Sequence, residues 1–110
     1  MNIETLKNNV CFSIDQAEKE IVNIGESIMD CPELGFKEFN TARKVCETFE
    51  ILGLPYQEEL AQTGVKARLK GKYSGPTVAI IGELDALLLP EHPRSDPDTG
   101  AAHACGHNAQ

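Results

Sequence analysis

Residues of types that bind metal ions gather near the end of the chain. His103, Cys105 and His107 lie at alternate positions of the sequence His-Ala-Cys-Gly-His. Thiolate and imidazole are ligands that zinc and related metals prefer, and Gly106 would let the loop turn around an ion. A lone Cys-x-His triplet is a weak signal, because a zinc site uses three or four ligands. The alternative is a buried cysteine beside ordinary loop histidines.

Two carboxylates form a second possible site. Glu83 and Asp85 follow the apolar residues 77–82 and are separated by one residue, so an extended chain places both on one side. Two acids on one face repel each other unless a cation, an arginine or a proton lies between them. The pair therefore indicates either part of a metal site or a solvated strand end.

Residues 77–82 predict the element that positions these carboxylates. This run is nearly all apolar, which is typical of a strand covered on both faces inside a mixed or parallel sheet. In open α/β sheets ligands bind outside the carboxyl ends of the strands, which is where Glu83 and Asp85 lie. The residues after Leu89 lack apolar periodicity and are rich in proline and acids, so we expect a long loop before His103.

A long helix is predicted at the start of the chain. Apolar residues recur at helical spacing from Ile3 to Ile28, which predicts one amphipathic helix with a single buried face. The helix should end near Asp30, because Pro32 pushes the residue before it out of helical geometry. We expect the apolar face to pack on the body of the chain, and a coiled-coil seam is the alternative.

A second helix and two short strands are predicted next. Asn40 or Thr41 can cap this helix, and Gly53 can close it in a left-handed conformation. One strand is expected over residues 54–60, and the alternation of apolar and basic residues over 65–70 predicts another with one exposed face. The predicted fold class is therefore α/β, with N-terminal helices packed on a mixed sheet.

The composition indicates one packed unit, or a piece of one: of 110 residues, 41% are hydrophobic and 25% charged. The net charge of -7 has the wrong sign for binding nucleic acid or an anionic membrane. The N-terminus has no basic segment followed by an apolar stretch, and the four cysteines lack the spacing of a disulfide framework. We therefore expect a cytoplasmic protein with reduced cysteines, in which Cys11, Cys31 and Cys46 are small buried hydrophobes.

Four motifs together resemble the opening of a known family. They are Pro-Glu-Leu-Gly-Phe at 32–36 with Glu38, Thr-Gly-Val at 63–65, Gly-Glu-Leu-Asp-Ala-Leu at 82–87, and Gly-Ala-Ala-His-Ala-Cys-Gly-His-Asn at 100–108. In order and spacing they resemble the dinuclear metal-dependent amidohydrolases and metallopeptidases related to aminoacylase and carboxypeptidase G. The subgroup they resemble most contains the auxin-conjugate, hippurate and p-aminobenzoyl-glutamate hydrolases.

The resemblance implies that residues 1–110 are the N-terminal portion of a zinc-peptidase-like catalytic domain. The rest of that domain, and a lid domain used for dimerisation, would follow Gln110. The implied activity is hydrolysis of an amide bond in N-acyl amino acids or short peptides. It would use two divalent metal ions, with zinc expected first and manganese or cobalt as replacements.

The isolated chain is expected to be inactive, because most of the ligands would lie beyond it. We also expect self-association or a homodimer, since a truncated sheet leaves apolar surface uncovered. The alternative function is a non-enzymatic scaffold or interaction domain that holds a metal ion weakly or between two copies.

The resemblance also implies roles for individual residues. Cys105 and His107 match positions of metal ligands. Asp85 matches the constant aspartate that supports the metal cluster and is the candidate catalytic residue, with Glu83 beside it. His103 occupies a motif position that is not counted as a ligand and stays a candidate. Most members read Asp-Met-Asp where this chain has Glu-Leu-Asp at 83–85, a difference that resembles the p-aminobenzoyl-glutamate branch.

Overall fold

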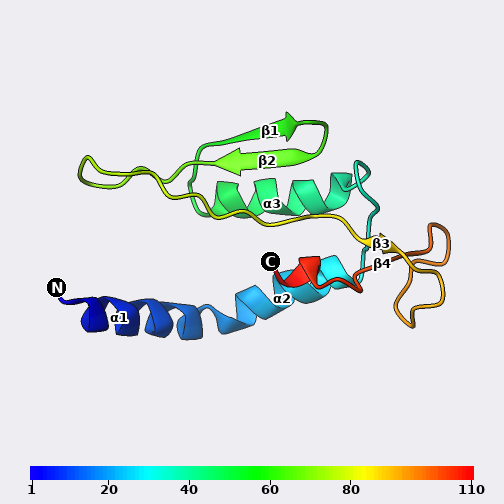
Figure 1. Ribbon diagram of the computed structural model, residues 1–110, viewed down its shortest axis with the longest axis horizontal. Helices are drawn as coiled ribbons and strands as arrows, with labels where there is room; N and C mark the ends of the chain where they lie inside the picture. Colours follow the sequence, from blue (N-terminus) through cyan, green and yellow to red (C-terminus); the bar gives the residue numbers. More distant parts are fainter.

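The computed structural model describes all residues from 1 to 110, and it contains both helices and strands, in agreement with the predicted α/β class. In chain order its elements are α1 (Ile3–Gln16), α2 (Glu18–Met29), α3 (Phe39–Ile51), β1 (Tyr56–Leu60), β2 (Gly64–Ala67), β3 (Leu87–Leu88), β4 (Ala101–Ala102) and the 3-10 helix η1 (His107–Ala109). Figure 1 shows α1 and α2 as one long arm, with α3 and the β1–β2 hairpin in a separate layer. None of the helices is long and apolar enough to span a membrane.

The first helical segment is two helices rather than the single one predicted. The helix breaks at Ala17, and Asn2 caps its start by accepting a hydrogen bond from the Thr5 N–H at 2.8 Å. The predicted end is confirmed, since α2 stops at Met29 just before the proline. The predicted burial is wrong, because α1 buries no residue and only Ile28 of the apolar stripe is buried. No other element of the chain covers the remaining stripe.

Helix α3 begins with a cap that the sequence analysis did not predict. Neither Asn40 nor Thr41 caps it with its side chain; both residues instead donate their backbone N–H groups to the carboxylate of Glu33, at 3.1 and 2.7 Å. A carboxylate at this position also suits the positive end of the helix dipole. The predicted C-terminal end is confirmed, since Gly53 is left-handed with φ 67°.

The predicted strands after α3 are confirmed as an antiparallel hairpin, although β2 ends at Ala67 rather than near residue 70. The hairpin packs on α3, as Figure 1 shows. Its loop is fixed to the segment before α3, because the Thr63 hydroxyl donates to the Glu38 carboxylate at 2.8 Å and both side chains are buried.

The predicted central strand at residues 77–82 is wrong. These residues are extended, form no hydrogen bond and are exposed, with Val78 84% and Ile80 98% accessible. The predicted mixed sheet is also absent: the sheets are two antiparallel pairs, β1–β2 and β3–β4, with one parallel bridge between Leu34 and Ala86. A strand covered on both faces needs neighbouring strands and helices, and no element of this chain supplies them.

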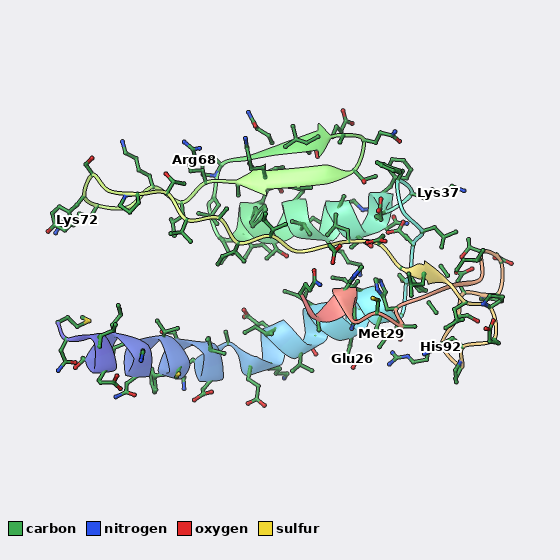
Figure 2. The ribbon with its side chains drawn as sticks, viewed as in Figure 1. Glu26, Met29, Lys37, Arg68, Lys72 and His92 are labelled. Carbon is green, nitrogen blue, oxygen red and sulfur yellow. The ribbon has the colours of Figure 1, made fainter.

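The small core lies at the end of the molecule where the segment after α2 meets β3 and β4. Ala86, Ala101 and Ala102 are buried there. The loop after β3 is fixed to α2 through ion pairs of Arg94 with Glu26 and Asp30. Figure 2 shows Lys72 at the tip of the extended chain, far from His92 in this loop. The radius of gyration is 16.3 Å, against about 13 Å for a compact domain of this size, so much of the chain extends away from the core.

The four cysteines are free thiols, but only Cys46 is buried as predicted. Cys11 on α1 and Cys31 after α2 are exposed. Cys11 lies on a helix that buries none of its residues, and Cys31 lies in an exposed turn, so the prediction of both as buried hydrophobes is wrong.

Candidate metal centre

The loop that carries the predicted ligands is held against α2. Gly106 adopts a left-handed conformation, with φ 82°, and turns the chain into η1, whose first residue is His107. The Asn108 amide donates to the Gly25 carbonyl oxygen at 3.3 Å. A Cβ atom at position 25 would lie 3.5 Å from the Asn108 backbone oxygen, an ordinary contact distance, so the loop passes close to α2 here without a steric requirement for glycine.

His107 lies between the two carboxylates of the predicted acidic pair. Its Nε2 is 3.0 Å from Oε2 of Glu83, and its Nδ1 is 3.0 Å from Oδ1 of Asp85. One ligand atom from each of the three residues can be chosen so that all lie within 4.8 Å of one another. The expectation that alternation places both acids on one side is therefore confirmed. We call these three residues the His107 cluster.

A backbone contact determines which ring nitrogen of His107 carries the proton. Nδ1 is 2.9 Å from the Asp85 carbonyl oxygen, which can only accept a hydrogen bond. The proton of the neutral ring therefore belongs on Nδ1, and the Nε2 lone pair faces the Glu83 carboxylate. A histidine fixed in this way is typical of metal ligands, whose second nitrogen is held by a carbonyl or a carboxylate.

The same contacts favour the charged form of His107 when no cation is bound. The hydrogen bond to the Asp85 backbone raises the pKa of His107 above its ordinary value, and the negative charges of Glu83 and Asp85 add to this effect. Partial burial acts in the opposite direction without reversing it. Proton and cation would thus compete for Nε2.

Two residues that the sequence analysis did not single out support the cluster. Gln110 contacts Glu83 twice, accepting from its backbone N–H at 2.6 Å and donating to its carboxylate at 3.3 Å. Glu33 accepts the backbone N–H of Ala86, one residue after Asp85, at 2.7 Å. Gln110 has no sequence signal, and the motif that contains Glu33 predicted no role for it in the site, because each contact joins segments that are distant along the chain.

The structure does not bring His103 and Cys105 into the cluster. Cys105 is exposed, and its thiol is not among the grouped ligand atoms. His103 is only 4% exposed, and neither ring nitrogen has a hydrogen-bond partner. Burial lowers the pKa of His103, and the charge of His107 lowers it further. The ring nitrogens of His103 therefore have unused hydrogen-bonding capacity, and both effects favour the neutral imidazole.

The donor set of the cluster fits a divalent cation. One imidazole and two carboxylates offer nitrogen and oxygen ligands of the kinds that zinc, manganese and cobalt accept. The side chains of Glu83 and Asp85 are 60% and 37% exposed and that of His107 is 12% exposed, so the cluster is open on its acidic side. An open side leaves room for further ligands or a substrate.

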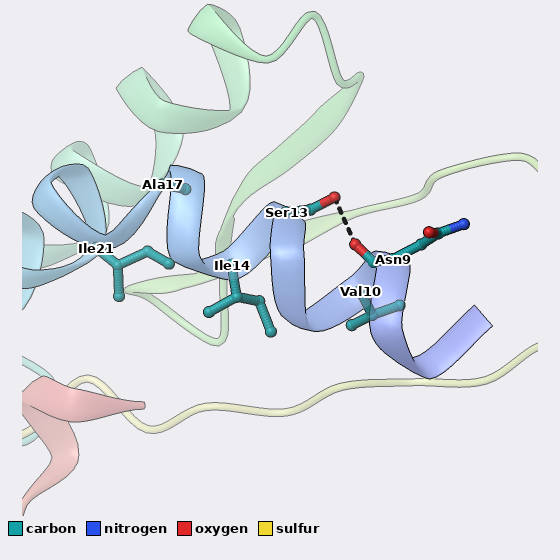
Figure 3. A pocket seen from close by; sticks show the side chains of 6 residues that line it. All are labelled: Asn9, Val10, Ser13, Ile14, Ala17 and Ile21. Atoms are coloured by element: carbon teal, nitrogen blue, oxygen red, sulfur yellow. Dashed lines mark hydrogen bonds between the residues drawn. The ribbon is translucent and has the colours of Figure 1, made fainter. Parts of the chain in front are cut away.

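A hollow elsewhere on the molecule is a poor catalytic candidate. It is a shallow, open hollow of about 350 Å³ where α1 meets α2. Figure 3 shows its lining side chains, Asn9, Val10, Ser13, Ile14, Ala17 and Ile21. The only side-chain hydrogen bond among these residues runs from the Ser13 hydroxyl to the Asn9 backbone carbonyl oxygen, and none of the side chains is titratable.

Comparison with known proteins finds relatives over most of the chain. It is 36% identical to thermostable carboxypeptidase 1 of Saccharolobus solfataricus, over 96% of the chain and 27% of the relative. It is 35% identical to N-acetylcysteine deacetylase of Bacillus subtilis, over 80% of the chain and 24% of the relative. It is 33% identical to hippurate hydrolase of Campylobacter jejuni, over 91% of the chain and 27% of the relative. The chain thus spans about a quarter of the length of these curated relatives.

No protein-family model and no solved structure matches the chain. The relatives found by sequence are named as hydrolases of amide bonds, which agrees with the predicted resemblance.

Proposed function

Because the chain belongs to the family of amidohydrolases and carboxypeptidases that these relatives represent, we propose that its protein hydrolyses the amide bond of N-acyl amino acids or short peptides. Two relatives are named for N-acetylcysteine and hippurate, and both compounds are N-acyl amino acids. The chain would form the N-terminal portion of the catalytic domain, with a lid domain elsewhere in the protein.

The observation that carries this proposal is the arrangement of His107. The Asp85 carbonyl oxygen orients the ring so that the Nε2 lone pair faces Glu83. A chain segment that served only as a solvated strand end would have no need of a histidine held between two acids. The buried imidazole of His103, with no partner of its own, adds a further polar group that the site could use.

The residues would divide the work as follows. His107 and Cys105 would bind a divalent cation, zinc first, with Glu83 as a further ligand; Asp85 would fix the orientation of His107. The bound metal would supply Lewis acidity that polarises the scissile carbonyl group. In this family two ions are expected, so the remaining ligands would come from other parts of the protein.

Two further proposals concern the setting of the protein. Its free cysteines suit a reducing compartment, the cytoplasm. The exposed apolar residues of 77–82 would drive self-association, and a homodimer is the form we propose.

Metal content after purification without a chelator tests the proposed centre. We expect the chain to bind Zn²⁺ weakly, because the remaining ligands would come from other parts of the protein. Its affinity for Zn²⁺, measured by calorimetric titration, should fall in His107→Ala by more than the roughly 100-fold that loss of a supporting partner can cost. His92→Ala is the matched control, because His92 is also a half-buried loop histidine but lies outside the cluster. Cys105→Ala shows whether the thiolate joins the centre. Equal zinc binding by wild type and His107→Ala would refute the proposal.

A further inference from the structure

We propose that Glu33 is a positioning residue for the His107 cluster. Its side chain is bonded to the start of α3, and its backbone carbonyl oxygen holds the chain beside Asp85. The inference rests on the proposed function, since it concerns the same site, and it gives the Pro-Glu-Leu motif at 32–34 a role in that site.

The carboxylate of Glu33 is fixed by four hydrogen bonds. Oε1 accepts from the Thr41 N–H and the Thr41 hydroxyl, both at 2.7 Å. Oε2 accepts from the Asn40 N–H at 3.1 Å and from the Asn40 side-chain amide at 3.2 Å. Thr41 is only 1% exposed, so its two bonds to Glu33 are shielded from water. Hydrogen bonds to a charged acceptor are stronger than neutral ones, and four of them leave Glu33 little freedom.

The backbone of the same residue reaches the site. The Glu33 carbonyl oxygen accepts the Ala86 N–H at 2.7 Å, and Leu34 forms a parallel bridge with Ala86. Asp85 immediately precedes Ala86, and its own carbonyl oxygen is the group that accepts from His107. The path from α3 to the orienting contact of His107 is therefore continuous: Glu33 carboxylate, Glu33 carbonyl, Ala86, Asp85.

Among the residues before Ala86, only Glu33 accepts a backbone hydrogen bond from the segment that carries Glu83 and Asp85. Residues 77–82, which precede the cluster along the chain, form no hydrogen bond and so do not restrain the positions of Glu83 and Asp85. Apart from contacts with the C-terminal loop, through Gln110 and His107, the first anchor of this segment is the bond from Ala86 to Glu33. Releasing Glu33 from α3 should therefore let Asp85 move away from His107.

Glu38 offers a matched control. It lies in the same segment before α3 and is buried, and it accepts a hydrogen bond from the Thr63 hydroxyl at 2.8 Å. Its contact fixes the β1–β2 hairpin loop, however, and involves no residue of the cluster. Loss of Glu38 should affect the packing around α3 without disturbing Asp85.

The test compares Glu33→Ala, Glu33→Gln and Glu38→Ala with the wild-type chain. Two quantities are measured: the affinity for Zn²⁺ by calorimetry, and the hydrogen-exchange protection of the Ala86 amide without metal. We expect Glu33→Ala to lose roughly 10- to 100-fold in Zn²⁺ affinity, as is typical when a supporting partner is removed, and to lose Ala86 protection. Glu33→Gln keeps one acceptor oxygen and should retain part of the Zn²⁺ affinity and part of the Ala86 protection. Glu38→Ala should keep both near wild type.

The outcomes separate this inference from the proposed function. Unchanged Ala86 protection in Glu33→Ala overturns the inference, as does an equal loss of Zn²⁺ affinity in Glu38→Ala. If the wild-type chain binds no Zn²⁺, the proposed metal centre fails, and the Ala86 exchange still decides whether Glu33 positions the segment.

Discussion

Two regions of the molecule, which we call the polar end and the apolar end, are held by different forces. In the polar end, which includes the start of α3, the hairpin loop and the loop before β4, buried or half-buried polar groups such as Glu33, Glu38, Thr41 and Thr63 satisfy one another through short hydrogen bonds. Along α1 and residues 77–82, by contrast, apolar side chains are exposed and contact little. Except at the buried ring nitrogens of His103, these polar groups find their partners within this chain, whereas the apolar surfaces lack the partners that would cover them.

The physical reason lies in what each kind of contact requires. A hydrogen bond needs two groups in the right place, and a short segment can supply both. Burial of an isoleucine stabilises a fold by about 1.5–3 kcal/mol, but only when several neighbours enclose it. Ile80 is 98% exposed and Thr41 is 1% exposed, so in this chain the hydroxyl is enclosed and the isoleucine is not.

The largest effect on stability is expected at the polar end. Thr41→Val removes the hydroxyl that donates to Glu33 while keeping nearly the same shape. Because the acceptor is charged, we expect a loss of about 1.5–3 kcal/mol in the free energy of unfolding, measured by urea denaturation. Thr77→Val, the same change at an exposed position of the apolar end, should stay within about 0.5 kcal/mol. Equal losses in the two variants would remove the distinction between the ends.

A smaller effect on stability, but a clear one on association, is expected at the apolar end. Ile80→Lys places a charge in residues 77–82 and breaks no folded contact, so the free energy of unfolding should change by less than about 0.5 kcal/mol. Light scattering should show that self-association of the wild-type chain weakens in this variant.

Ile51→Lys is the control for this change. It adds the same charge at an 85% exposed position at the end of α3, outside residues 77–82. It should leave association near the wild-type level. A wild-type chain that stays monomeric at every concentration would contradict the proposed self-association.

The sequence predicted the features that depend on neighbouring residues and failed for those that depend on distant contacts. Local signals were sufficient for the end of α2 before Pro32, the left-handed Gly53 and the β1–β2 hairpin. Glu83 and Asp85 lie on one side, as their alternation predicts, and His107 is close to both, but the predicted ligand Cys105 is not in this group. Each of these depends on a few neighbouring residues or on one motif.

The failures concern contacts that no local pattern specifies. Residues 77–82 read as a buried strand because their composition is that of a strand in the middle of a sheet, yet burial depends on elements that this chain does not contain. The cap of α3 by Glu33 joins residues seven and eight positions apart, outside the spacing of an ordinary capping residue. The placement of Gln110 against Glu83 spans 27 positions, which the sequence cannot reveal.

The smallest effect expected is a selective response of the polar end to acid. Asp96 closes the loop before β4 by accepting the N–H groups of Asp98 and Thr99 at 2.9 and 2.8 Å, and these bonds lower the pKa of Asp96 below its ordinary 3.8. Its contribution to folding is therefore complete above 3.8 and is lost as the pH falls through the lower pKa of the folded state.

Amide chemical shifts of Asp98 and Thr99, followed against pH, should report this loss with a midpoint below 3.8. Asp96→Asn keeps an acceptor oxygen and does not titrate, so its amide shifts should lose that step. Residues 77–82 contain no titratable side chain and should show no local step of their own. A midpoint at or above 3.8, or the same step in Asp96→Asn, would mean that the Asp96 carboxylate does not hold the loop before β4. Hydrogen bonds would then contribute less to the polar end than its contrast with the apolar end implies.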